Sequence, residues 1–128
     1  MLPAEIIQCL SEVTGLTVAE LPAVLHYGNA AEPAHEIHIE SDQELITLWC
    51  ALPCPEGVAI GETLLRINSG WRDPSASWLY YDPRRHAPVL ISTFTRSMTS
   101  PAQFCTSAEL FFKACDTMRT LLADRVRH

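Results

Sequence analysis

The residues best suited to metal chemistry in this chain of 128 residues are a short alternation of acids and histidine. Glu36, His38 and Glu40 alternate with isoleucines, so in a strand they share one face and could together hold a metal ion. Nothing else nearby completes a ligand set. We therefore predict the exposed polar face of an outer strand, with no metal and no cofactor.

Five cysteines are the other chemical candidates, and they form neither a zinc-type nor a redox CxxC pattern. Cys50 and Cys54 have CxxxC spacing interrupted by Pro53, and Cys50 lies in an apolar run. Cys105 with one of the five histidines could supply a nucleophile and a base, but no sequence context supports this pairing. We interpret the cysteines as reduced, buried thiols, and we expect no catalytic residue.

Composition excludes several classes of protein. The apolar fraction is 48% and the net charge is −6, with a mean hydropathy of +0.08 and a pI of about 5.2. A general nucleic-acid binder should be basic. No run reaches the roughly 18 apolar residues of a membrane span, and the N-terminus does not resemble a signal peptide. We expect one domain, residues 1–128, in a reducing cytoplasm.

The stretch from residue 44 to residue 71 organises the rest of the chain. Residues 44–52 predict a strand with apolar side chains on both faces, which therefore needs cover on both sides. Residues 58–71 predict a helix whose apolar stripe is Ile60, Leu64, Ile67 and Trp71. This strand and helix need more hydrophobic cover than so small a chain easily supplies, so a partner surface is expected to supply it.

Helices are predicted over residues 3–14 and near the C-terminus, and further strands over 23–27, 35–40, 76–82 and 88–95. The final helix has two candidate starts, at Ser100 and at Thr106, and the capping pattern at Thr106 is preferred. Arg84, Arg85 and His86 predict a solvated hairpin tip. The class is α+β, with a mainly antiparallel sheet and the order α-β-β-β-α-β-β-α. If most helices cover one face of the sheet, the other face stays open and partly apolar.

This order resembles that of the class I type III secretion chaperones. The resemblance covers nearly the whole chain. It depends on the first helix with Ile6 and Leu10, the strand 45–52 ending in Leu-Pro, the helix carrying residues 64–68, and the long final helix. The cysteine count and the 84–86 tip depart from a typical member. The resemblance implies a cytoplasmic bacterial homodimer that is not an enzyme and that keeps a secreted effector soluble and competent for secretion.

The resemblance also implies where partners bind. Grooves formed by the first helix and the sheet would hold the N-terminal segment of the effector in extended form. The candidate effector-binding residues are Ile6, Ile7, Leu10, Ile46, Leu48, Cys50, Tyr80 and Ile91. The candidate dimer-interface residues are Ile60, Leu64, Ile67, Trp71 and Trp78. The ATPase of the secretion apparatus is a further candidate partner, whereas nucleic acid and membrane insertion are not expected. The alternatives are a small cytosolic enzyme using a thiol or a metal, and a regulatory adaptor of the same fold.

Overall fold

The computed structural model describes residues 1–28, 34–53, 60–70 and 77–127, and its element order is the one that the sequence predicts. The elements are α1 (Pro3–Thr14), β1 (Ala23–Tyr27), β2 (His35–Ser41), β3 (Leu45–Ala51), α2 (Ile60–Gly70), β4 (Trp78–Asp82), β5 (Ala87–Thr95), a short 3-10 turn η1 (Arg96–Met98) and α3 (Pro101–Arg127). The strands form one antiparallel sheet in the order β1-β2-β3-β5-β4.

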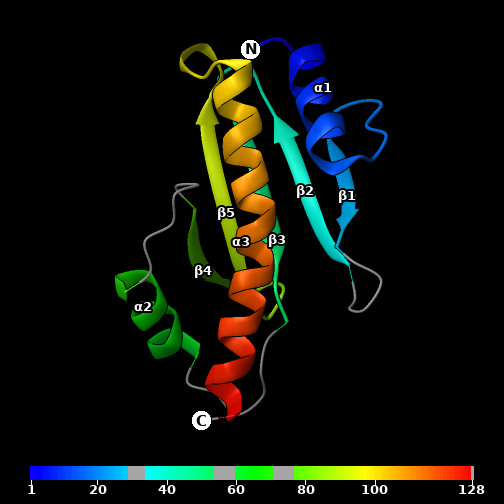
Figure 1. The fold of residues 1–128 in the computed structure, drawn as a ribbon. Helices are drawn as coiled ribbons and strands as arrows, with labels where there is room; N and C mark the ends of the chain where they lie inside the picture. The colour runs from blue at the N-terminus through cyan, green and yellow to red at the C-terminus, as the bar shows by residue number, and fades with distance from the viewer. Residues whose placement is uncertain (29–33, 54–59, 71–76, 128) are drawn as a thin grey trace.

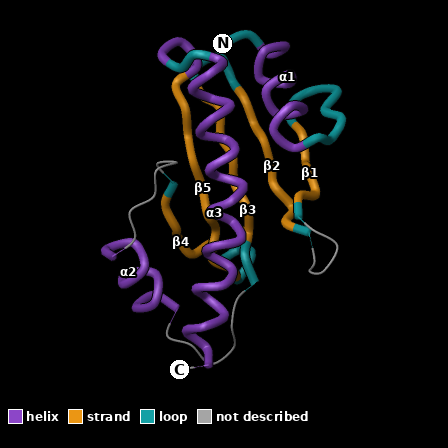
Figure 2. The backbone as a smooth tube through the Cα atoms, viewed as in Figure 1, coloured by secondary structure: helices purple, strands orange, loops and turns teal. Residues whose placement is uncertain are grey.

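The helices gather on one face of this sheet (Figure 1). α3 runs along the sheet, α1 lies beside it over β1 and β2, and α2 lies beside β4 (Figures 1 and 2). Alternate strand residues supply the core beneath them, as in β3, where Ile46, Leu48 and Cys50 are fully buried. Phe111 and Phe112 of α3 are also fully buried in this core. One face of the sheet is thus closed by helices, and among the described residues no helix lies on the opposite face.

The final helix begins at Pro101, so the preferred start at Thr106 was wrong. The Ser100 backbone N–H donates to Gln103 Oε1 at 2.9 Å, and the Gln103 N–H donates to Ser100 Oγ at 3.2 Å. This reciprocal pair is a capping box, and it satisfies two backbone donors at the helix start. Thr106 is already inside the helix, where its hydroxyl donates to the Ala102 carbonyl. The capping pattern at Thr106 is therefore not used.

α2 is attached to the outer edge of β4 through one side chain. Asn68 Nδ2 donates to the Leu79 carbonyl at 2.8 Å, and the Leu79 N–H donates to Asn68 Oδ1 at 3.2 Å. Leu64 and Ile67 join Leu79 in the same hydrophobic core. The helix is therefore held by an amide bridge on one side and by apolar packing on the other.

The turn between β2 and β3 is held by Asp42. Its Oδ1 accepts the backbone N–H groups of Glu44 and Leu45, each at 2.7 Å. These two hydrogen bonds stabilise the carboxylate and lower the pKa of Asp42 below its usual value of 3.8. The Asp42 carbonyl also accepts from Arg96, which ties this turn to the end of β5.

We expect the Asp42 carboxylate to make folding depend on pH in acid. A lowered pKa in the folded state means that its contribution is complete above pH 3.8 and is lost as pH falls through the folded value. Asp42→Asn keeps an acceptor oxygen but removes the titration, so its stability should fall less steeply between about pH 5 and pH 2. Urea unfolding across that range checks this, and a wild-type slope in Asp42→Asn would contradict it. Asp42→Ala should be less stable than wild type even at pH 7.

Candidate protein-binding surface

The uncovered face of the sheet carries a row of mostly apolar side chains across every strand. The strand register places Val24, His38, Trp49, Ile91 and Trp78 directly beside one another, from β1 to β4. Adjacent strands lie about 4.8 Å apart, so the row is about 19 Å long. We call these five residues the cross-strand row. The valine is 47% exposed and the tryptophan of β4 is 45% exposed, so both ends of the row are open to solvent.

Trp49 is the fixed centre of this row. The imidazole of His38 stacks on its indole, with ring centroids 3.8 Å apart and planes 9° from parallel. The guanidinium carbon of Arg85 lies 4.4 Å from the same ring. The indole is therefore restrained by two planar groups, one from β2 and one from the turn between β4 and β5. The sequence predicted a solvated tip at Arg85, whereas this side chain folds back onto the sheet.

A shallow hollow of about 290 Å³ lies beside Trp49, and its walls include Ala51, Glu36 and Arg85. Val89, next to Ala51 on the uncovered face, is fully buried although it lies outside the main core. This surface therefore combines a buried apolar residue, an aromatic side chain held in place and charged residues at the edge of the hollow, which are features of protein-binding sites.

A second hollow lies at the other end of the sheet, beside α1. It has a volume of about 540 Å³, and its walls include Pro3 and Ile7 of α1, Leu21 of the following loop, and Arg96. Ile7 is only half-buried, in contrast to its neighbour Ile6. The first helix, the loop after it and the turn between β2 and β3 thus leave a recess between them.

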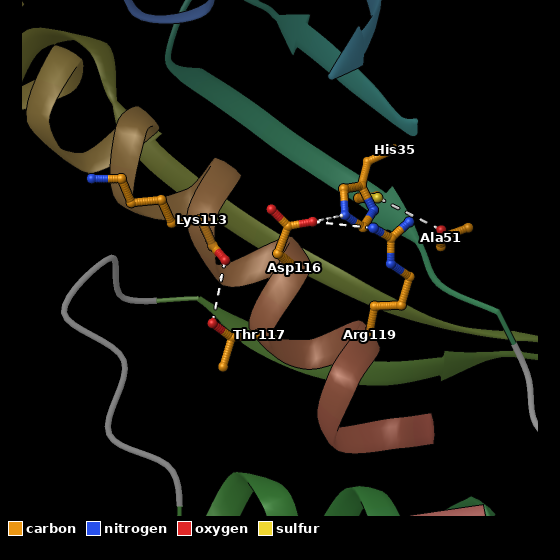
Figure 3. A network of polar contacts seen from close by, with 7 residues as sticks. His35, Ala51, Lys113, Asp116, Thr117 and Arg119 are labelled. Atoms are coloured by element: carbon orange, nitrogen blue, oxygen red, sulfur yellow. Dashed lines mark hydrogen bonds and ion pairs between the residues drawn. The ribbon is translucent and has the colours of Figure 1, made fainter. Parts of the chain in front are cut away.

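A polar network joins α3 to the sheet, with His35 and Cys50 buried and the Asp116 side chain 54% exposed (Figure 3). His35 Nε2 lies 2.6 Å from Asp116 Oδ1, and Arg119 Nη2 lies 3.2 Å from the same oxygen. Hydrogen bonding to Cys50 and to Asp116 raises the pKa of His35, although burial opposes this. Hydrogen bonds from Cys115 and then from His35 lower the pKa of Cys50 to about 6, again against burial. The network joins β2, β3 and α3.

This network contains the cysteine, histidine and acid that a thiol enzyme would need, but Cys50 has no exposed surface. A nucleophile must reach its substrate, and the hollows beside Trp49 and Ile7 are lined by other residues. The arrangement supports a structural role that satisfies the buried polar groups of His35. Among the described residues, no group of three or more His, Cys, Asp or Glu side chains could hold a metal ion.

Comparisons with known proteins bear on the fold. No family model and no curated protein sequence matches this chain. Among solved structures, the chain is similar to one in the HopA1-SchA chaperone-effector complex, with 12% identity, a TM-score of 0.65, and coverage of 91% of this chain and 92% of that one. It is similar to one in the ExoU-SpcU complex of the Pseudomonas aeruginosa type III secretion system, with 18% identity, a TM-score of 0.63, and coverage of 95% of this chain and 98% of that one. It is also similar to one in a complex of the Yersinia pestis type III secretion chaperone SycH with a fragment of YscM2, with 12% identity, a TM-score of 0.60, and coverage of 91% of this chain and 98% of that one.

The fold is that of the class I type III secretion chaperones. The sequence resemblance to this fold is thereby confirmed, although identities of 12% to 19% show the fold alone. In the part of this chain that the structure describes, no helix is long and apolar enough to cross a membrane.

Within this chaperone fold, the residues predicted to bind an effector separate into two groups. Fully buried in the core are Ile6, Leu10, Ile46, Leu48 and Cys50. As the chain is folded, these side chains cannot touch a partner, because they are packed in the chain's own core. The others are accessible: Ile7 lines the recess beside α1, while Tyr80 and Ile91 lie on the uncovered face of the sheet. Their contact with an effector remains a prediction.

The residues predicted for the dimer interface are also divided in this chaperone fold. Leu64 and Ile67 are buried against the chain's own core, so they have little surface left for a second subunit. Trp78 is exposed on β4. The side chain of Ile60 and the whole of Trp71 lie outside the described residues. A homodimer remains a prediction, and its surface in this region would be the outward side of α2 and β4.

The sequence-based prediction missed most of the uncovered face because, in the strand 45–52, it took Ile46, Leu48 and Cys50 for the partner-binding side. Val24, Trp49 and Ala51 lie on the uncovered face, and the α2 residue Leu65 is 73% exposed. One signal in the sequence indicates the correct side. The alternate residues that include Ile46 and Leu48 are more uniformly apolar than those that include Thr47, which favours them for the core.

Proposed function

We propose that this chain is a type III secretion chaperone that binds the N-terminal segment of a cognate effector. It would hold that segment in extended form on the cross-strand row and in the recess beside α1, which keeps the effector soluble and competent for secretion. The observation that carries this proposal is the uncovered, partly apolar sheet face in a chain with the secretion-chaperone fold. A contiguous apolar patch on a small acidic protein marks an interaction site.

Holding a client requires no catalytic group, because binding alone shifts the client away from aggregated states by mass action. In this proposal the buried thiol and histidine network keeps α3 on the sheet and takes no part in chemistry. The protein would act in the bacterial cytoplasm as a homodimer, whose two copies present two such faces. The ATPase of the secretion apparatus remains a predicted second partner.

The test is co-expression of this chain with the product of the neighbouring gene. We expect a soluble complex in which proteolysis leaves a protected segment from the N-terminal region of that product. Light scattering of the free chain at micromolar concentration should show a dimer. A complex that forms only with a folded domain of the product, and leaves its N-terminal region cleavable, would favour the regulatory adaptor instead.

A further inference from the structure

The uncovered sheet face has an acidic ridge along β2. Glu36 and Glu40 are both exposed there and lie on either side of His38. Glu36 Oε1 contacts His38 Nε2 at 3.0 Å and keeps 60% of its side chain exposed. Among the described residues, no ion pair reaches Glu40. The ridge therefore presents two carboxylates to solvent, one on each side of the cross-strand row.

An arginine beside the same face is already engaged. Arg85 lies over the indole of Trp49, and its Nε is 3.6 Å from Asp82 Oδ2. Its charge is therefore partly neutralised within the chain, unlike that of Glu40. With a net charge of −6 for the whole chain, the potential over β2 favours a positive partner.

The spacing of the ridge matches that of an extended chain. Glu36 and Glu40 are four residues apart in a strand, so their side chains project about 13 Å apart, with the cross-strand row midway between them. An extended client lying along β2 has the same pitch. If one residue of the client faces Glu36, the residue two positions later would face the cross-strand row, and the residue four positions later would face Glu40.

We propose that this face selects a client segment with the pattern basic–x–apolar–x–basic, whose two cations meet Glu36 and Glu40 while the apolar residue packs on Val24 and Trp49. This inference rests on the proposed function, because it names the chemistry of the segment that the chaperone holds. The cross-strand row supplies the affinity, and the two carboxylates of the acidic ridge supply the selectivity among apolar segments.

Three short synthetic peptides test the pattern. The first has lysines at positions i and i+4 around a leucine at i+2, the second has the same composition with the two lysines adjacent, and the third has glutamate in place of lysine. Calorimetry at low ionic strength should show the first peptide binding about fivefold more tightly than the second, with the third weakest. Added salt should reduce the advantage of the first peptide.

The Glu36→Gln/Glu40→Gln variant should remove the preference for the first peptide. The matched control is Glu12→Gln/Glu109→Gln, which removes the same charge from exposed positions on α1 and α3, and it should keep the preference. Equal losses in both double variants would overturn the inference, because bulk charge would then explain the preference. Equal binding of all three peptides to the unmodified chain would overturn it and leave the proposed function standing. Binding of none would also overturn it, and co-expression would then judge the proposed function separately.

Discussion

Leu64→Asp should unfold this chain, whereas Leu65→Asp should leave it folded and separate the proposed dimer. The two leucines are adjacent on α2, but Leu64 is 5% exposed and packs in the core, while Leu65 is 73% exposed. A carboxylate at the buried position loses the packing of the leucine and has no partner for its charge. We expect a loss of more than about 3 kcal/mol in the free energy of unfolding.

At Leu65 the same substitution should change the stability of the subunit by less than about 0.5 kcal/mol, because the side chain already faces solvent. If α2 faces a second subunit, sedimentation should then show a monomer where the unmodified chain is a dimer. Urea unfolding and sedimentation of both variants separate the two effects. A folded, dimeric Leu64→Asp would contradict the described burial, and a dimeric Leu65→Asp would remove this part of α2 from the interface.

Trp49→Ala should weaken binding of the effector segment by about 30-fold, which corresponds to about 2 kcal/mol. The indole is the centre of the cross-strand row, and it is restrained by the stacked imidazole of His38 and by the guanidinium of Arg85. A client that packs on this restrained ring costs the chain little side-chain freedom, which is why we expect the effect to be large. The measurement is titration of the purified segment of the proposed effector into the purified chain.

The control for Trp49→Ala is Met98→Ala, which removes another exposed apolar side chain, 81% accessible, from the turn before α3. It should leave the affinity within about twofold of wild type, which is the scale of a surface substitution outside an interface. Equal losses in both variants would indicate nonspecific adhesion. An unchanged affinity in Trp49→Ala would show that the client does not bind to this face of the sheet.

Element order and fold class could be predicted from the sequence because they depend on local signals. Alternation in residues 35–40 predicted a strand, and the structure has β2 there, paired with β3. The helix predicted over residues 3–14 is α1, and Gly15 ends it with φ of 70° while its N–H donates to the Ser11 carbonyl. The start of α3 could not be chosen from pattern alone, since two capping sequences compete and tertiary packing selects one.

The candidate site was harder to predict because burial within a chain and burial between chains leave the same sequence pattern. The α2 stripe containing Leu64 and Ile67 is apolar, but its partner is the chain's own core. The strand 45–52 carries apolar residues on both parities, and the helices cover the more uniformly apolar one, which contains Ile46 and Leu48. The stacking of His38 and Arg85 on Trp49 joins residues from three segments, so no local pattern could reveal it.

The amide bridge from Asn68 to Leu79 has a consequence for how this sheet can grow. An incoming strand alongside β4 would need the same N–H and C=O groups that the asparagine occupies, so it would have to displace α2 first. At the opposite edge of the sheet, no side chain of the described residues occupies the outward backbone groups of β1 in this way. A strand from another chain can therefore be added beside β1 but not beside β4, where Asn68 protects the edge from unwanted polymerisation.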